Sequence, residues 1–105
     1  MFPVPLFPAK REVFAWIKDG RKTVDVRKGR AWRGEVAVIQ SGASYLRFRI
    51  VKKETGKLSE VIRSDNFLAV IPTAETVDDA LAFLRGIYGN REGVFTAYYL
   101  AKSDP

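Results

Sequence analysis

Apolar and polar residues alternate along the first half of the chain, and this period of two predicts β-strands. In the first such segment Val24 and Val26 point to one side, opposite Asp25 and Arg27. The third segment shows the pattern most clearly, because inward apolar positions alternate with outward cations. The expected strands are 23–27, 35–40 and 45–53. Each of them buries one face and leaves polar side chains on the other.

Helical spacing of apolar residues predicts three further elements, and residues typical of helix ends bound them. The expected helices are 10–19, 57–63 and 76–88. Gly20 and Gly89 follow the first and last of these, where a residue in the left-handed conformation would end a helix. Thr76 and Asp79 have the spacing of a capping box at the start of the last helix.

The remaining segments complete an α+β order. The first eight residues contain three prolines and predict an extended arm laid over the body. Residues 64–72 are irregular but apolar, so we expect them to pack on the core. Residues 94–100 are apolar on both faces, which indicates a strand covered on both sides. Helix, three strands, two helices and a strand predict an α+β fold, and a chain of 105 residues fits one domain, 1–105.

The composition excludes several kinds of chemistry. The chain has no cysteine and no histidine, so it can form neither disulfides nor thiolate metal sites. It also lacks the usual general base, the usual zinc ligand and any Ser-His or Cys-His nucleophile pair. We expect no metal and no cofactor. The apolar opening lacks the basic start of a signal peptide, and no run approaches the roughly 20 apolar residues of a membrane span. We therefore expect a cytoplasmic protein without membrane contact.

The net charge of +6 is unevenly distributed. Residues 10–57 contain 14 Lys/Arg and 5 Asp/Glu, whereas residues 58–105 contain 4 Lys/Arg and 7 Asp/Glu. One positive face follows if folding keeps the basic half together, and such a face favours nucleic acid or another anionic ligand. The alternative is a solvated surface whose charges scatter once the chain folds.

The basic half supplies the candidate binding residues. Five cations occur within the 12 residues 22–33, and two more occupy the outward face of a strand that we expect to pair nearby. Arginine offers a planar donor fork that can bind phosphate with two hydrogen bonds, and lysine offers a point charge. The candidate nucleic-acid contacts are Lys22, Asp25, Arg27, Lys28, Arg30, Trp32, Arg33, Arg47 and Arg49.

Two of these residues have alternative interpretations. Trp32 lies among arginines, where it could stack on an unpaired base, or it could fill the end of a barrel. Asp25 lies on the same strand face as Arg27, so the two could form a structural ion pair. Asp25 could also accept a hydrogen bond from a base amino group in a cleft that Lys22 and Arg27 complete.

The string Gly20-x-Lys22-x-x-Asp25-x-Arg27 resembles the motif Gly-x-Lys-x-x-Glu-x-Arg of the ASCH family, which are small β-barrels of the PUA-like superfamily. Aspartate stands here where the family usually has glutamate. Gly34-Glu35 at the next strand is similar to a Gly-Asp pair of the family, and the second half of the chain is similar to small archaeal members. These similar segments are 66–72, 75–80, 87–88 and 93–94. The resemblance implies a PUA-like β-barrel with flanking helices and a cleft that holds the motif.

The resemblance also implies a function that involves RNA. The leading hypothesis is an RNA-binding or nucleotide-binding module. The alternative is an enzyme with Lys22 as the base, because one branch of the family is an amidohydrolase on acetylated cytidine and another is reported as a ribonuclease. The amidohydrolase set is a lysine, a threonine three residues later and a distant glutamate. Asp25 replaces that threonine, and Thr73 with Glu75 nearby falls where the glutamate would be. A third hypothesis is a protein-interaction domain that uses the acidic rear half.

Overall fold

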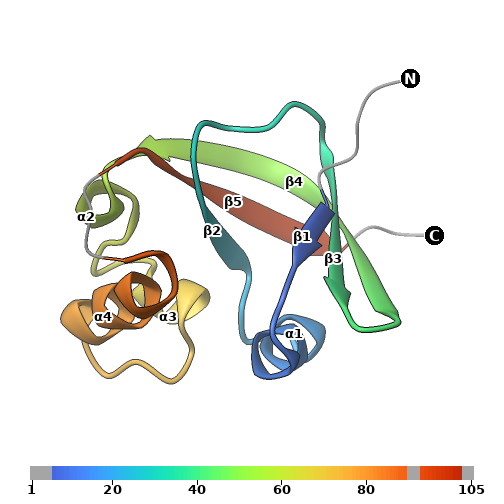
Figure 1. Cartoon of the computed structure of the whole chain (residues 1–105), viewed down its shortest axis with the longest axis horizontal. Helices are drawn as coiled ribbons and strands as arrows, with labels where there is room; N and C mark the ends of the chain where they lie inside the picture. Colours follow the sequence, from blue (N-terminus) through green and yellow to red (C-terminus); the bar gives the residue numbers. More distant parts are fainter. Residues whose placement is uncertain (1–5, 90–92, 103–105) are drawn as a thin grey trace.

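A five-stranded sheet forms the centre of the protein (Figure 1). The computed structural model describes residues 6–89 and 93–102. The strands are β1 (Leu6–Pro8), β2 (Val24–Lys28), β3 (Val36–Ser41), β4 (Ser44–Gly56) and β5 (Phe95–Lys102). Their order in the sheet is β1-β3-β4-β5-β2, and all neighbours are antiparallel except β1 and β3. The sheet curls into a half-barrel whose two edges are β1 and β2.

Four helices in the described part of the chain cover this sheet, so the α+β class is confirmed. The helices are α1 (Arg11–Lys18), α2 (Leu58–Val61), α3 (Phe67–Val70) and α4 (Val77–Tyr88). The element boundaries agree with the sequence prediction within two residues except in two segments. The strand expected to end at residue 53 continues to Gly56, because residues 54–56 still pair with the long strand β5. The stretch expected to be irregular contains the single turn α3.

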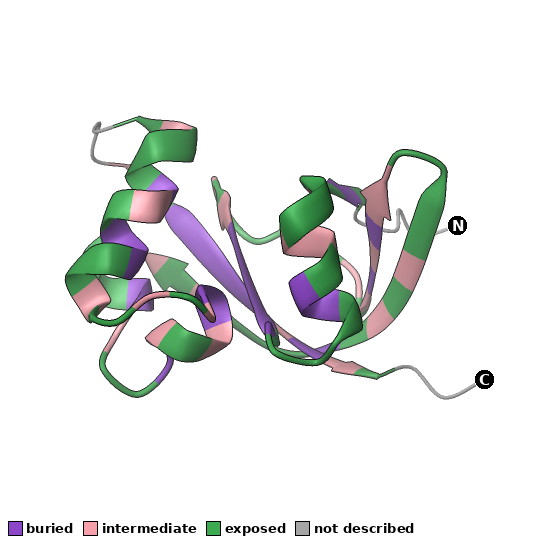
Figure 2. Ribbon diagram, turned by 90° about the horizontal axis from the view of Figure 1, so that it is seen from below, coloured by how far each residue is buried: buried purple, intermediate pink, exposed green. Residues whose placement is uncertain are grey.

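Each face of the sheet has its own hydrophobic core. On one face α2, α3 and α4 pack over β2 and β5, and on the other α1 and β1 pack over β3, β4 and β5. Helix α1 serves both, because Trp16 belongs to the first core and Ile17 to the second. Figure 2 shows buried residues along β5, where Phe95 to Tyr98 are all at most 2% exposed. The prediction of a strand covered on both faces is therefore confirmed.

The expected helix ends are present. Gly20 and Gly89 have φ of 80° and 88°, a conformation that a residue with a Cβ adopts only with strain. Asp79 N donates to Thr76 Oγ1 at 3.1 Å, and Thr76 N donates to Asp79 Oδ2 at 3.1 Å, which completes the capping box. The expected N-terminal arm is described from Leu6 onward, where β1 pairs with β3. Its first five residues lie outside the described part.

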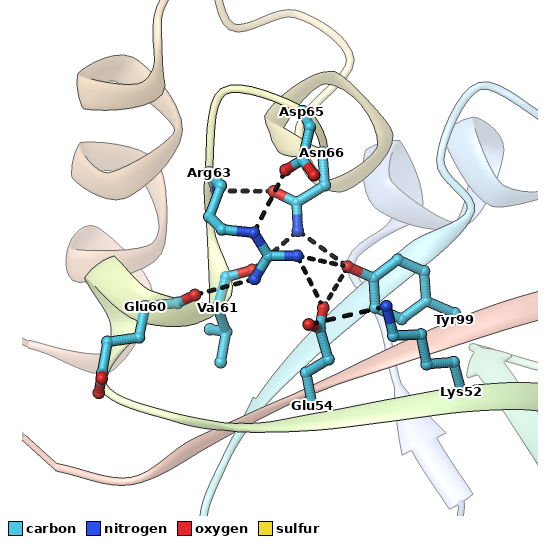
Figure 3. Close-up of polar contacts among 8 residues, drawn as sticks. All are labelled: Lys52, Glu54, Glu60, Val61, Arg63, Asp65, Asn66 and Tyr99. Atoms are coloured by element: carbon cyan, nitrogen blue, oxygen red, sulfur yellow. Dashed lines mark hydrogen bonds and ion pairs between the residues drawn. The ribbon is translucent and has the colours of Figure 1, made fainter.

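A polar cluster fastens α2 and α3 to the sheet (Figure 3). Asn66 Nδ2 donates to Val61 O and to the Tyr99 hydroxyl, both at 2.9 Å, and its Oδ1 accepts from Arg63 N at 2.7 Å. The Tyr99 hydroxyl donates to Glu54, which also accepts from Arg63 Nη2 at 3.0 Å. The bond from Tyr99 is the largest cause that holds the pKa of Glu54 below its usual value. Residue 66 thus links the start of α3 to β4 and β5.

This linkage predicts that Asn66→Ala lowers the free energy of unfolding by about 1–3 kcal/mol, because the buried partners of its amide lose their hydrogen bonds. Urea denaturation followed by circular dichroism measures the change. Ser64→Ala, an exposed neighbour, is the matched control and should stay within about 0.5 kcal/mol of the wild type. Equal stabilities of the Asn66 and Ser64 variants would contradict the role of the cluster.

Candidate functional site

A hollow of about 100 Å³ lies beside β2, at the edge that pairs with no other strand in the described part of the chain. Its charged residues are Lys10, Lys22, Asp25 and Arg27, and Tyr88 adds a hydroxyl group. Apolar side chains after α3 and on α4 form one wall, and the connection from β1 to α1 forms the opposite wall. We call this hollow, around Lys22, Asp25 and Arg27, the motif cleft. The three charged residues that the sequence placed in one cleft therefore do line one hollow.

Lys22 is a buried cation in this cleft, with 5% of its surface exposed. Its Nζ donates to Val24 O at 2.7 Å and to Val70 O at 2.6 Å. Burial lowers the pKa of Lys22 to about 8, while the charge of Asp25 acts to raise it and that of Arg27 to lower it. The side chain is therefore mainly an ammonium at neutral pH, and that ammonium has a third donor beyond the two carbonyl bonds.

Asp25 and Arg27 form the ion pair that their spacing indicated. Arg27 donates from Nε to Asp25 Oδ1 at 2.6 Å and from Nη2 to Oδ2 at 3.1 Å. A third donor, Nη1, bonds Pro8 O at 2.8 Å, and the guanidinium lies 4.7 Å from the centre of the Phe7 ring. Burial acts to lower the pKa of Arg27, but the charge and hydrogen bonds of Asp25 outweigh it, so this pKa is raised. These bonds hold the Asp25 carboxylate and the Arg27 guanidinium in one orientation on the cleft wall.

Tyr88 closes the cleft at its α4 side. Its hydroxyl donates to Val26 O at 3.2 Å, just as Lys22 bonds Val24 O, so both outward carbonyls of β2 have donors. Burial is the largest cause that raises the pKa of Tyr88. Tyr88 packs against the first core and also lines the motif cleft. Tyr98 is fully buried and does not line this hollow.

A second hollow of about 200 Å³ adjoins the motif cleft and shares Pro8, Arg27 and Tyr88 with it. Leu6, Phe7, Lys28 and Trp32 complete its lining, and we call it the aromatic hollow. Trp32 is 51% exposed, and its ring meets Phe7 edge-on at 6.4 Å between ring centres.

The backbone of Trp32 is held firmly although its ring is exposed. Its N–H donates to the Tyr98 hydroxyl at 2.8 Å, and its carbonyl accepts from Lys53 Nζ at 2.6 Å. These contacts fix the loop between β2 and β3 across the mouth of the half-barrel. The ring itself therefore keeps an open face beside the aromatic hollow.

The other predicted site residues fall into two groups. Arg30 and Arg33 are exposed on the loop that carries Trp32, and they line neither hollow. Arg47 and Arg49 are exposed on β4, which pairs with β3 and β5. Because β5 lies between β4 and β2, the expectation that their strand pairs next to the motif is wrong. Arg47 instead lines a third hollow beside α1.

Sequence reasoning missed Lys10 and Pro8, which both line the motif cleft. Their position depends on the parallel pairing of β1 with β3, a contact for which local periodicity gives no signal. Thr73 and Glu75, the positions compared with a catalytic glutamate, are exposed and line neither hollow. The described residues contain no group of three acidic side chains placed to hold a metal ion, and none of their helices is long and apolar enough to cross a membrane.

Comparison with known proteins rests on structure, because no family model and no curated protein matches this sequence. The crystal structure of a hypothetical protein, PH0355, superposes with a TM-score of 0.74 at 13% identity, covering 93% of this chain and 97% of that one. A mutant of ZmASCH from Zymomonas mobilis superposes with a TM-score of 0.70 at 17% identity, covering 95% of this chain and 68% of that one. At such identities the likeness concerns the fold. The chain therefore has the fold of a small ASCH-like domain.

Proposed function

We propose that the protein is an RNA-binding or nucleotide-binding module that holds single-stranded RNA at the edge of β2. One observation carries the proposal: Lys22, Asp25 and Arg27 line an open hollow with apolar walls, and a half-exposed tryptophan stands beside it. Unpaired bases are recognised by this combination of polar groups for the base edge and flat surfaces for the ring.

The motif cleft offers both kinds of hydrogen-bonding group that a base edge requires. The Asp25 carboxylate has lone pairs beyond the two bonds from Arg27, and these accept from an exocyclic amino group. The remaining donors of Lys22 and Arg27 serve a base carbonyl. Ile71, Phe83 and Leu84 supply the apolar wall for the ring. With Lys22 protonated the four charged groups of the cleft, Lys10, Lys22, Asp25 and Arg27, sum to +2, which suits a neutral base with a phosphate close by.

The phosphates need other cations, because Arg27 already uses three donors within the protein. Lys28, Arg30 and Arg33 are exposed at the end of β2 and on the following loop, and none takes part in an ion pair among the described residues. They surround Trp32, whose open ring face lets a neighbouring base stack. The proposal therefore assigns base recognition to the cleft, stacking to Trp32 and phosphate binding to the loop.

A hydrolase acting on modified nucleosides, or a ribonuclease, is the second candidate, and the lowered pKa of Lys22 favours it. A neutral amine could keep both carbonyl bonds and direct its lone pair elsewhere, as a general base must. However, Asp25 is tied to Arg27, and Thr73 and Glu75 lie outside the cleft, so a complete catalytic set is missing from the described residues. Incubation with acetylated cytidine and with labelled RNA tests this candidate, and turnover that Lys22→Met abolishes would establish it.

The phosphate contacts predict that Lys28→Glu with Arg30→Glu weakens binding of a fluorescent single-stranded RNA 12-mer at least tenfold, about 1.4 kcal/mol. The plot of log affinity against log salt should also become shallower by about 1.4, because two phosphate contacts are lost. Fluorescence polarisation at several KCl concentrations measures both effects.

The matched control for this pair is Lys57→Glu with Arg85→Glu, which makes the same charge change at exposed positions that line neither hollow. If both pairs weaken binding equally, only the net charge matters and the assigned loop is refuted. A wild-type protein that binds no RNA at low salt would refute the whole proposal.

The stacking role predicts that Trp32→Ala weakens the same RNA about 5- to 150-fold, which corresponds to about 1–3 kcal/mol. Tyr45→Ala is the control, because Tyr45 is an aromatic residue near the start of β4 that is at least as exposed as Trp32, and it should leave the affinity unchanged. Trp32→Phe should restore most of the loss. Undiminished binding by Trp32→Ala would show that this ring only covers the end of the half-barrel.

The buried amine predicts a pH effect on stability. Because the folded pKa of Lys22 is about 8 and the ordinary value is 10.5, the unfolded chain binds the extra proton between these two pH values. Stability relative to Lys22→Met should therefore rise from pH 8 to pH 10.5, by about 3 kcal/mol in all. Urea denaturation of both proteins measures this difference, with Lys57→Met as the control for general alkaline effects. A difference that stays constant with pH would show that the amine titrates normally.

A further inference from the structure

A third hollow, of about 190 Å³, contacts α1 one helical turn further along its axis than the motif cleft does. Its lining comes from three elements: Ile17 and Lys18 of α1, Leu46, Arg47 and Phe48 of β4, and Lys102 of β5. Lys102 is the direct neighbour of Phe48 across the two strands. We call this hollow the α1–β4 groove. In Figure 2, α1 stands between the layer of α2–α4 and the β3–β4 hairpin. Residues of this one helix line both hollows.

The groove combines three cations with an apolar floor. Lys18, Arg47 and Lys102 come from separate elements, no carboxylate lines the groove, and none of the three takes part in an ion pair among the described residues. Cations gathered around a concavity attract an anion more strongly than the same charges on a flat surface. Ile17 is 2% exposed, whereas Leu46 and Phe48 are only partly buried and present apolar surface to the groove.

This combination selects among anions. A free phosphate or an acidic side chain would use the cations but would leave the apolar floor without a partner. A nucleotide uses both, because its phosphate binds the cations while its base packs on an aromatic or aliphatic surface. We infer that the α1–β4 groove is a second nucleotide subsite, which holds another part of the same RNA strand as the motif cleft.

The inference rests on the proposed function and extends it. The motif cleft uses Val13 of α1, and the groove uses Ile17, one helical turn and about 6 Å further along the axis. A strand that follows α1 from one hollow to the other gains the second contact without a second encounter, so its affinity rises by avidity. A single nucleotide reaches only one of the two hollows at a time.

The test compares RNA length in two charge-reversal variants of the full chain. Arg47→Glu with Lys102→Glu removes two groove cations. Arg49→Glu with Lys57→Glu makes the same charge change, with Arg49 on the same strand as Arg47 but outside the groove. Fluorescence polarisation and competition give the affinities for a nucleoside monophosphate and for a 12-mer of mixed sequence. The groove pair should lose at least tenfold in affinity for the 12-mer and less than threefold for the single nucleotide, and the control pair less than threefold for both.

Several outcomes would overturn the inference. If the wild type binds the 12-mer and the groove pair binds it equally well, the groove takes no part, while the proposed function stands. An equal loss in both pairs, or an equal loss for both lengths, would mean a general charge effect. Groove-dependent binding of a poly-glutamate peptide without any RNA effect would assign the groove to an acidic protein segment. No RNA binding by the wild type would refute the proposed function and this extension together.

Folding of the groove pair is checked by circular dichroism, and both residues are exposed, so the native fold should persist. A second variant, Lys18→Gln, keeps the test valid if the pair is unstable. It neutralises the α1 cation with little change in shape, and it should weaken binding of the 12-mer about threefold or more, with the affinity for the single nucleotide unchanged. Unchanged 12-mer binding by a folded Lys18→Gln would count against the subsite.

Discussion

The hydrogen bonds of the Lys22 ammonium to Val24 O and Val70 O hold the site together. The bond to Val24 O satisfies a carbonyl on the unpaired edge of β2, and the bond to Val70 O reaches the last residue of α3. A backbone hydrogen bond, from Thr23 N to Ala69 O at 3.0 Å, joins the same two segments. The polar cluster of Asn66 and Tyr99 in turn fixes α3 on the sheet. The position of the motif therefore depends on a chain of contacts that crosses the whole helical layer.

Placing a charge in this position has a cost, because a buried ammonium loses its hydration. Two carbonyl oxygens and the nearby carboxylate of Asp25 offset part of that cost, and the remainder shows as the lowered pKa. All buried side-chain nitrogen and oxygen atoms in the described residues have hydrogen-bond partners. The polar groups of the cleft are thus already oriented by their neighbours before any ligand arrives, and recognition does not require them to reorganise.

Local patterns in the sequence predicted those parts of the site that depend on local structure. The alternation around Val24 and Val26 placed Asp25 and Arg27 on one face, and their ion pair follows from that spacing. The contact of Arg27 with Pro8 could not be predicted in this way, because it depends on β1 pairing with a strand 30 residues later in the chain. The same limit explains Arg47: alternation shows that it faces outward, but only the strand order shows which hollow it lines.

The anchoring of Trp32 has a consequence for the entropy of ligand binding. Two hydrogen bonds from the body of the protein fix its backbone, so the loop is ordered before a ligand arrives. Association then restricts mainly a side chain, at about 0.5–1.5 kcal/mol, instead of a flexible segment at about 1–2 kcal/mol for each residue. Only the torsions of the indole ring then remain to be selected, because its backbone is already held.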